Sequence, residues 1–553
     1  MEEKPKDLWE NTDGNKYQLH VTIPTIGSTT ESKDADEKVV YMEDLEKRKQ
    51  VYGICGECNE PGTGKYWCQP CNAKRFKDNF KNWTSGNKVI DEFIQQSQLN
   101  AVHCFKCLEW IPFEKFQNVT YIAEGGFGKI YSAEWPEGII IYWDIENQKW
   151  ARYSYDKYAL KSLNNSSDIC SDFLNEIKSH LKIYIDDIVR CYGITQDPNT
   201  KEHMMVLYYC SKGNLRNYLT KSESYINYKT KIDELQQIAR GLLDVHNSGF
   251  VHKDFHSGNI LHNHSFPFIS DLGMCQPANK QSIKEQGIYG VLPFMAPEVL
   301  RGHQYTKAAD IYSFGIMMNE FLSEEIPFND IPHDKFLAIQ ICKGYRPKIS
   351  KDVPKLLADL IIKCWDAEIG NRPTTKELYQ LLTKWNDEIK NIEGSDDDSE
   401  DSEDNEDNED NEDSDDNEGS ENSKDSEGNG DNEDNEDIGD SEDSENVKNS
   451  QNSEIYSQVK ECDKIRRKKF KSKSNKDKSI NIQTHPQAIY TSRLLNFKDL
   501  PKPVNSSDLS SFQFNSDADY AIQSTLANPL SAQLSELVEV NSLSNLKSML
   551  NSS

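Results

Sequence analysis

The sequence predicts an α+β domain over residues 116–389, and three observations carry this prediction. Strand-like runs alternate with amphipathic segments there, over the only span long enough to bury a large core. A glycine-rich loop at 123–128 is flanked on both sides by β-branched and aromatic residues, which predicts that it joins two strands. Residues 308–318 are apolar on nearly every face, as expected of a helix enclosed in a large lobe.

Most of the net charge of the chain lies in one tract outside this domain. The 553 residues carry a net charge of −29, but residues 394–446 alone hold 28 acidic residues and one lysine. Since this tract accounts for −27 of the total, the rest of the chain is nearly neutral, and the overall acidity says nothing about its partners. We expect no membrane span, because no run of 18 apolar residues occurs.

The chain divides by composition into five parts. We expect a disordered leader (1–49), a cysteine-rich module with a linker (50–110), the folded domain (116–389), an acidic low-complexity tract (394–446) and a disordered Ser/Asn/Lys-rich tail (447–553). The leader and the tail are too polar to offset the entropy of ordering them. The first residues lack the features of a secretory signal, so we expect a cytoplasmic protein, with the nucleus as an alternative.

Two Cys-x-x-Cys pairs separated by nine residues predict a small zinc-ribbon-like module. They are Cys55 with Cys58 and Cys68 with Cys71. Each pair can present two thiolates to one Zn²⁺, and four thiolates leave no open position, so the predicted metal is structural. The alternative is a set of reduced cysteines without metal.

Other residues near the module admit two interpretations. His103, Cys104 and Cys107 lack an obvious fourth ligand for a second metal, and packing against the folded domain is the alternative. A run of basic residues could bind nucleic acid, but a solvated face is the preferred interpretation, and we expect no nucleic-acid partner. These residues are Lys74, Arg75, Lys77 and Lys81.

The glycine-rich loop predicts a cover for phosphate groups. Dinucleotide-binding and Walker loops open onto a helix N-terminus, whereas this loop joins two strands. A glycine hairpin can instead bring backbone amides close to phosphate oxygens, because no side chain intervenes. The loop and its flanks are Ile122, Ala123, Glu124, Gly125, Gly126, Phe127, Gly128, Lys129 and Ile130.

Further motifs follow in a fixed order and resemble those of the eukaryotic protein kinases. Lys161 ends the run Tyr-Ala-Leu-Lys, which is similar to V-A-I-K, and Glu176 follows on a predicted helix. Asp254 and Asn259 lie five residues apart in a run that resembles H-R-D-L-x-x-x-N, and Asp271 begins Asp-Leu-Gly, which is similar to D-F-G.

This resemblance implies a bilobal fold, with a small β-rich lobe and a large helical lobe, and a MgATP-dependent phosphotransferase. Lys161, held by Glu176, would contact the phosphates of ATP. Asp254 would accept the proton of the attacking hydroxyl, and Asn259 and Asp271 would hold Mg²⁺. Tyr208 to Cys210 would form the hinge that binds adenine, with Leu207 at the back of the pocket.

Two structural motifs support the resemblance independently. Glu298 ends Met-Ala-Pro-Glu, which resembles the A-P-E motif, and Arg372 lies in a late Asn-Arg-Pro. The resemblance implies that these two residues pair. Residues 232–243 carry the one-sided apolar stripe of a helix that leads into the Asp254 loop.

Some positions depart from the family pattern. Ala123 replaces the first glycine, Lys253 replaces an arginine, and residues 135–155 form an insertion that predicts a longer hairpin, either a decorated loop or a docking surface. His256 and Val291 stand where serine/threonine kinases usually place lysine and threonine. The set resembles the tyrosine-kinase-like branch, which favours serine or threonine of protein substrates over tyrosine.

A catalytically weak, pseudokinase-like scaffold that binds protein partners is the alternative function. Within the segment that follows Asp271, Ser282 and Tyr289 could accept a phosphate. The basic run 466–471 could be a nuclear import signal, bind nucleic acid or pair with the acidic tract. The tail could also bind a protein partner through an apolar helical face formed by Leu530, Leu534, Leu537 and Val538.

Overall fold

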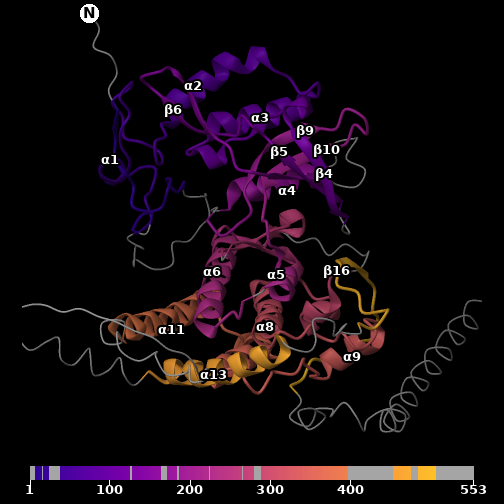
Figure 1. Ribbon diagram of the computed structural model, residues 1–553. Helices are drawn as coiled ribbons and strands as arrows, with labels where there is room; N and C mark the ends of the chain where they lie inside the picture. Colours follow the sequence, from indigo (N-terminus) through magenta and orange to yellow (C-terminus); the bar gives the residue numbers. More distant parts are fainter. Residues whose placement is uncertain are drawn as a thin grey trace, which may run out of the picture.

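Two lobes form the centre of the molecule, and the amino-terminal module and parts of the tail pack around them (Figure 1). The computed structural model describes residues 7–14, 16–23, 38–124, 128–162, 171–183, 186–222, 224–264, 266–278, 288–396, 453–474 and 484–505. The small lobe is built on a β-sheet and the large lobe on helices, so the predicted bilobal α+β fold is confirmed.

The small lobe is a six-stranded sheet with one helix, α4 (Ser171–Lys182). In spatial order its strands are β3 (Glu109–Trp110), β9 (Cys191–Gln196), β10 (His203–Tyr208), β8 (Tyr158–Ser162), β5 (Lys129–Glu134) and β4 (Gln117–Glu124). Strand β4 pairs antiparallel with β5, with Glu124 opposite Lys129, so the glycine-rich loop does join two strands as predicted.

The edge strand β3 connects the amino-terminal module to this sheet. It pairs in parallel with β9, with Glu109 opposite Gly193. A Cβ atom at Gly193 would lie 2.2 Å from the carbonyl oxygen of Glu109, so the two backbones can approach only because this residue has no side chain.

The insertion between β5 and β8 forms the predicted hairpin, and its outer face carries the amino-terminal module. Its strands β6 (Ile139–Asp144) and β7 (Lys149–Tyr153) pair antiparallel. On β7, Trp150 stacks on Phe76 and Trp67 of the module, with ring centroids 4.8 and 5.8 Å apart. The hairpin is therefore a docking surface, and its occupant is a part of the same chain.

The large lobe contains the longest helices of the folded domain. Its helices are α5 (Leu215–Lys221), α6 (Tyr228–Asn247), α7 (Pro297–Leu300), α8 (Lys307–Ser323), α9 (Lys335–Cys342), α10 (Lys355–Cys364) and α11 (Thr375–Asp396). Every residue of α8 from Ala309 to Ser323 is buried, which accounts for its lack of a polar face. Glu298 and Arg372 form a buried ion pair of 2.7 Å, as the resemblance implies.

Short strands line the cleft side of the large lobe. The strands β11 (Gly213–Asn214), β13 (Ile260–Asn263) and β14 (Phe266–Ile269) form one sheet, and β12 (Phe250–Val251) pairs with β15 (Gln276–Pro277). They fix the two ends of the loop that carries Asp254 and Asn259.

The leader is partly folded, so the expectation of disorder over residues 1–49 is wrong for its described parts. Strand β1 (Leu8–Trp9) pairs with β2 (Gly53–Ile54). Asp44 caps the N-terminus of α1 (Leu45–Tyr52), because its carboxylate accepts a hydrogen bond from the backbone of Lys47. Val21 and Val40 are fully buried with residues of α1. The module continues with α2 (Gln69–Asn79) and α3 (Lys88–Asn100). Its core therefore draws on apolar residues from both sides of the cysteine pairs.

The tail also contains ordered segments, which corrects the expectation of disorder over 447–553. Helix α13 (Glu454–Ser474) lies along the base of the large lobe, and β17 (Arg493–Leu495) pairs with β16 (Ile288–Gly290) (Figure 1). Ile455 and Val459 of α13 join the core of the large lobe. The few apolar residues of this polar tail thus have a preformed surface to cover.

Several predicted features lie outside the described residues: Gly125, Gly126 and Phe127 of the loop, Ser282, nearly all of the acidic tract and the apolar positions 530–538. Among the helices that are described, none is both long and apolar enough to cross a membrane.

Candidate functional site

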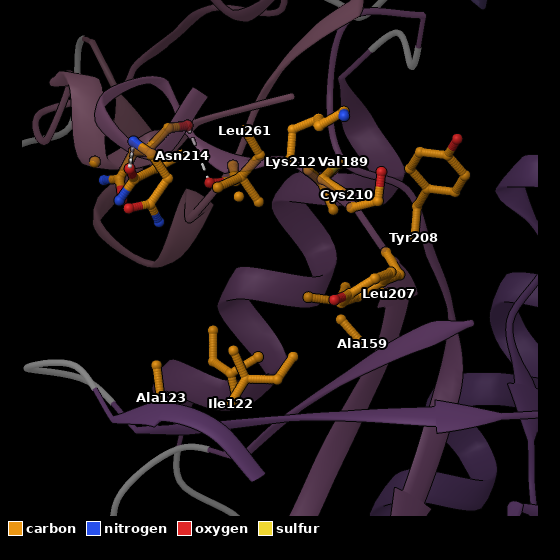
Figure 2. A pocket seen from close by; sticks show the side chains of 18 of the residues that line it. Ile122, Ala123, Ala159, Val189, Leu207, Tyr208, Cys210, Lys212, Asn214 and Leu261 are labelled. Atoms are coloured by element: carbon orange, nitrogen blue, oxygen red, sulfur yellow. Dashed lines mark hydrogen bonds between the residues drawn. The ribbon is translucent and has the colours of Figure 1, made fainter. Parts of the chain in front are cut away.

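A cavity of about 900 Å³ lies between the two lobes. Figure 2 shows Ile122 and Ala123 of β4 on one wall and Leu261 of β13 on the facing wall. Leu207, Tyr208 and Cys210 line the cavity where β10 leaves the small lobe, at the predicted hinge. The described residues that line the cavity thus come from both lobes and from the connection between them.

The predicted lysine, its predicted partner Glu176 and the predicted Mg²⁺ ligand Asp271 meet in this cavity. The Lys161 ammonium lies 2.8 Å from Oε1 of Glu176 and 3.0 Å from Oδ1 of Asp271. The Glu176 side chain is 2% exposed, whereas that of Asp271 is 22% exposed, so the Asp271 carboxylate is the more accessible of the two. Burial alone would favour the neutral amine, but Asp271 and Glu176 raise the pKa of Lys161 above its usual value.

The loop with Asp254 and Asn259 is held by a buried carboxylate of α8. Asp310 accepts hydrogen bonds from the backbone nitrogens of His252 and Lys253, at 2.8 and 3.0 Å. The Asn259 amide donates to the backbone carbonyl of Asp254 at 2.9 Å, which fixes the two residues relative to each other. Sequence spacing predicted this pair, and the structure brings it together.

Asp254 lies beside the cavity and has an environment that keeps it ionised. Its Oδ2 atom is 3.6 Å from Nε2 of His256 and accepts a hydrogen bond from the Ser492 hydroxyl, while Oδ1 has no hydrogen-bond partner within the described part of the chain. Burial would raise the pKa of Asp254, but His256, the Ser492 hydroxyl and His252 together lower it below its usual value.

The segment after Asp271 starts with an unusual backbone conformation. Asp271 has a φ of 58°, and Leu272 next to it is fully buried, which is the apolar packing role predicted for the middle residue of Asp-Leu-Gly. The ammonium of Lys253 lies 3.2 Å from the side-chain oxygen of Gln276, so its charge is directed at a neutral amide of this segment.

Not every predicted nucleotide-binding residue lines the cavity. Ile122, Ala123 and Ile130 do, whereas Glu124, Gly128 and Lys129 do not.

Three apolar residues that line the cavity were not predicted from the sequence as site residues: Ala159, Val189 and Leu261. Ala159 could have been found, because it precedes Lys161 by two residues on the same strand and therefore faces the same side.

The four predicted cysteines of the amino-terminal module also converge. The sulfur atoms of Cys55, Cys58, Cys68 and Cys71 lie within 4.8 Å of one another. The Cys55–Cys71 and Cys58–Cys68 sulfur distances are 3.9 and 3.6 Å. A Zn–S bond of about 2.3 Å in a tetrahedron separates neighbouring sulfurs by about 3.8 Å, so this geometry fits Zn²⁺.

His103, Cys104 and Cys107 do not form part of any such group of ligands in the described residues. Cys104 and Cys107 are buried in an apolar cluster with Trp67 and Phe76, and burial raises the pKa of the Cys104 thiol to about 12. These cysteines pack the interface between the module and the small lobe.

Comparison with known proteins agrees with this geometry. Residues 116–382 match the family model of the protein tyrosine and serine/threonine kinases. Serine/threonine-protein kinase VIK of Arabidopsis thaliana is 29% identical over 280 residues, which is 49% of this chain and 60% of that protein. The RGS domain-containing serine/threonine-protein kinase A of Dictyostelium discoideum is 28% identical, over 47% of this chain and 22% of that protein.

A third relative, serine/threonine/tyrosine-protein kinase HT1 of Arabidopsis thaliana, is 28% identical over 39% of this chain and 56% of that protein. In all three cases the matched part of the chain covers less than two thirds of the relative.

Proposed function

We propose that residues 116–382, which match the protein kinase family model, form a catalytically active kinase domain that transfers the γ-phosphoryl group of ATP to serine or threonine hydroxyls of proteins. One observation carries this proposal: Lys161 is in ionic contact with Glu176 and Asp271, and all three line a cavity that Asn259 also lines, with Asp254 hydrogen-bonded to Asn259. A scaffold without turnover would not need these charged groups in mutual contact, because desolvating them is costly.

The proposed roles follow from the position of each group. Lys161 neutralises charge on the phosphates and is oriented by Glu176. Asp254 orients the acceptor hydroxyl and takes its proton, for which its ionised carboxylate is suited. Asn259 and Asp271 provide oxygen atoms of the kind that Mg²⁺ prefers, and the ion would supply charge neutralisation at the phosphates.

Serine or threonine specificity rests on two observations. The relatives are named as serine/threonine-protein kinases, and the acceptor position next to Asp254 is occupied by a serine of the tail. Within the amino-terminal module we also propose a structural Zn²⁺ held by Cys55, Cys58, Cys68 and Cys71, since four thiolates fill a tetrahedral site and leave no open position for a substrate.

Phosphate transfer from radiolabelled MgATP to casein by the full chain tests the proposal. We expect Lys161→Met and Asp254→Asn each to lower the rate by about 100-fold or more, since they remove charge stabilisation or the general base. Lys157→Met and Asp156→Asn are matched controls, because both residues are exposed and lie shortly before β8. The controls should keep the wild-type rate.

Equal background transfer by wild type, Lys161→Met and Asp254→Asn would contradict the proposal and favour the scaffold alternative. Retained ATP binding, measured as a shift in melting temperature, would then show that the fold serves binding without turnover.

A further inference from the structure

A segment of the tail, residues 484–505, lies along the large lobe near β16 and α9 (Figure 1), and a hydrogen bond joins it to the catalytic loop. At its start, the backbone of His485 donates to Asn329 at 2.7 Å, and His333 binds the backbone of Gln487 and Ile489. At its end, the backbone nitrogen of Val504 donates to Cys342 at 3.0 Å. The segment is thus held on both sides of the catalytic loop.

The register of this segment is set by a strand pair and by apolar anchors. In the β16–β17 pair, Arg493 lies opposite Gly290 and Leu495 opposite Ile288. Leu495 is 4% exposed, while its neighbour Leu494 is 47% exposed, so a slip by one residue would expose the anchor. The residue that precedes Arg493 therefore has a fixed position.

That residue is Ser492, and its hydroxyl donates a hydrogen bond to Oδ2 of Asp254. A hydroxyl bonded to the proposed general base is in the position of a phosphoacceptor rather than of an inert blocker. The adjacent hydroxyl residue, Thr491, is exposed, and the hydrogen bond to Asp254 comes from Ser492. The structure thus distinguishes two neighbouring hydroxyl side chains.

From this contact, and resting on the kinase activity proposed above, we propose that Ser492 is phosphorylated by the kinase domain of its own chain. The Ser492 oxygen forms a bond to the γ-phosphorus of ATP, and the bond from that phosphorus to the β,γ-bridging oxygen breaks. ADP leaves, and the hydroxyl proton passes to Asp254. The products are ADP and a phosphoserine.

The phosphoserine that forms is not compatible with the position that the Ser492 hydroxyl occupies. A phosphoserine carries a charge of about −1.5 to −2 at neutral pH, and it would face the carboxylate of Asp254. Like-charge repulsion weakens the docking of residues 484–505 and opens the acceptor site to other proteins. The unmodified segment therefore competes with external substrates, and its phosphorylation ends the competition.

Mass spectrometry of the full chain tests this proposal. The protein is first treated with a phosphatase, which is then removed, and phosphorylation of Ser492 is followed after addition of MgATP. We expect the rate constant to stay the same over a 50-fold range of protein concentration, because the transfer is intramolecular. Ser492→Ala should abolish phosphorylation at position 492, whereas Ser492→Thr should be phosphorylated on the threonine. Thr491→Ala should leave the rate of Ser492 phosphorylation unchanged.

A second measurement uses casein as the external acceptor. Casein phosphorylation should start with a lag in the dephosphorylated wild type, and Leu495→Asp, which detaches the strand, should shorten the lag and slow modification of Ser492 at least 10-fold. Casein phosphorylation without modification of Ser492 would overturn this inference alone. A rate constant for Ser492 phosphorylation that rises in proportion to protein concentration would show transfer between molecules and overturn it too. Phosphorylation of Ser492 on an isotope-labelled Asp254→Asn chain mixed with wild type would have the same meaning. Absence of transfer to any acceptor would overturn the proposed function as well.

Discussion

The amino-terminal module and the tail are both attached to the kinase domain, but by different chemistry. The module joins the small lobe through stacked aromatic rings of Trp67, Phe76 and Trp150 and through the edge strand β3. The second half of α13 joins the large lobe mainly through ions: Arg466 pairs with Glu324 and Asp352 at 3.1 and 3.2 Å. The first attachment is mainly apolar, whereas charged contacts predominate in the second half of α13.

This difference indicates different roles. Apolar stacking is insensitive to salt and to charge on neighbouring groups, so the module behaves as a permanent part of the small lobe. In the tail, the Arg466–Glu324 and Lys469–Asp352 pairs each have one side chain that is open to solvent, 45% and 59% exposed, and such pairs are weakened by salt and by changes in charge. The tail is therefore the attachment that can be released under mild conditions, which fits a segment that reaches Asp254.

The largest expected effect comes from the cysteine cluster, on which the permanence of the module depends. Cys68→Ser should abolish stoichiometric zinc and unfold the module, since a structural Zn²⁺ contributes about 10 kcal/mol or more. Metal analysis and tryptophan fluorescence check this, and Cys462→Ser on α13 is the control. A folded, metal-free module in the wild type would refute the zinc proposal.

A smaller loss of stability is expected when only the aromatic interface between the module and the hairpin is disrupted. Trp150→Ala removes the ring that stacks on Phe76 and Trp67 and should lower the free energy of unfolding by about 2 kcal/mol, less than for a fully buried tryptophan because Trp150 is half-buried. Thermal unfolding at low and high salt measures the loss, which should not depend on salt. Tyr153→Ala on the same hairpin is the control, since Tyr153 is 55% exposed. A salt-dependent loss would remove the contrast with the tail.

For the tail, the expected effect is smaller still and depends on salt. Arg466→Met leaves Asp352 with fewer partners and should weaken the docking of α13 by about 1 to 2 kcal/mol. Hydrogen exchange of α13 at 50 mM and 500 mM salt measures this, with the exposed Lys468→Met as the control. Equal exchange in both variants would show that the apolar contacts of Ile455 and Val459 hold the helix without help.

We expect acid to weaken the docking of α13 on the large lobe over a defined pH range. Burial opposes ionisation of Asp352, but Ser350, Lys469 and Arg466 lower its pKa below its usual value. The stabilisation is therefore complete above the unfolded pKa of about 4 and decreases as the pH falls below it. Methyl NMR signals of Ile455 and Val459 between pH 6 and pH 3 check this. In Asp352→Asn the same signals should show weaker docking already at pH 6 and less dependence on pH, while Asp359→Asn is the control.

The sequence predicted the site better than its surroundings. Lys161, Glu176, Asp254, Asn259 and Asp271 were identified because phosphoryl transfer restricts residue type and spacing at these positions. The contact of Ser492 with Asp254 could not be predicted, because it joins residues far apart in the chain and the flanking sequence is polar.

The leader and α13 were expected to be disordered for a related reason. Each has only a few apolar residues, such as Val40 and Ile455, and composition alone cannot show that a preformed surface exists to bury them. Arg466 and Lys469 were recognised as part of a basic run, but their acidic partners on the large lobe are set by the tertiary structure.

The close approach of Glu109 to Gly193 makes the module and the small lobe one continuous sheet. Lys161 lies in the same sheet, on β8, which is separated from β9 by the single strand β10. A change in structure at the cysteines can therefore be transmitted through this sheet to Lys161, the lysine that we propose contacts phosphate. Chelating agents in a purification buffer could thus impair phosphate transfer while every catalytic side chain remains chemically intact.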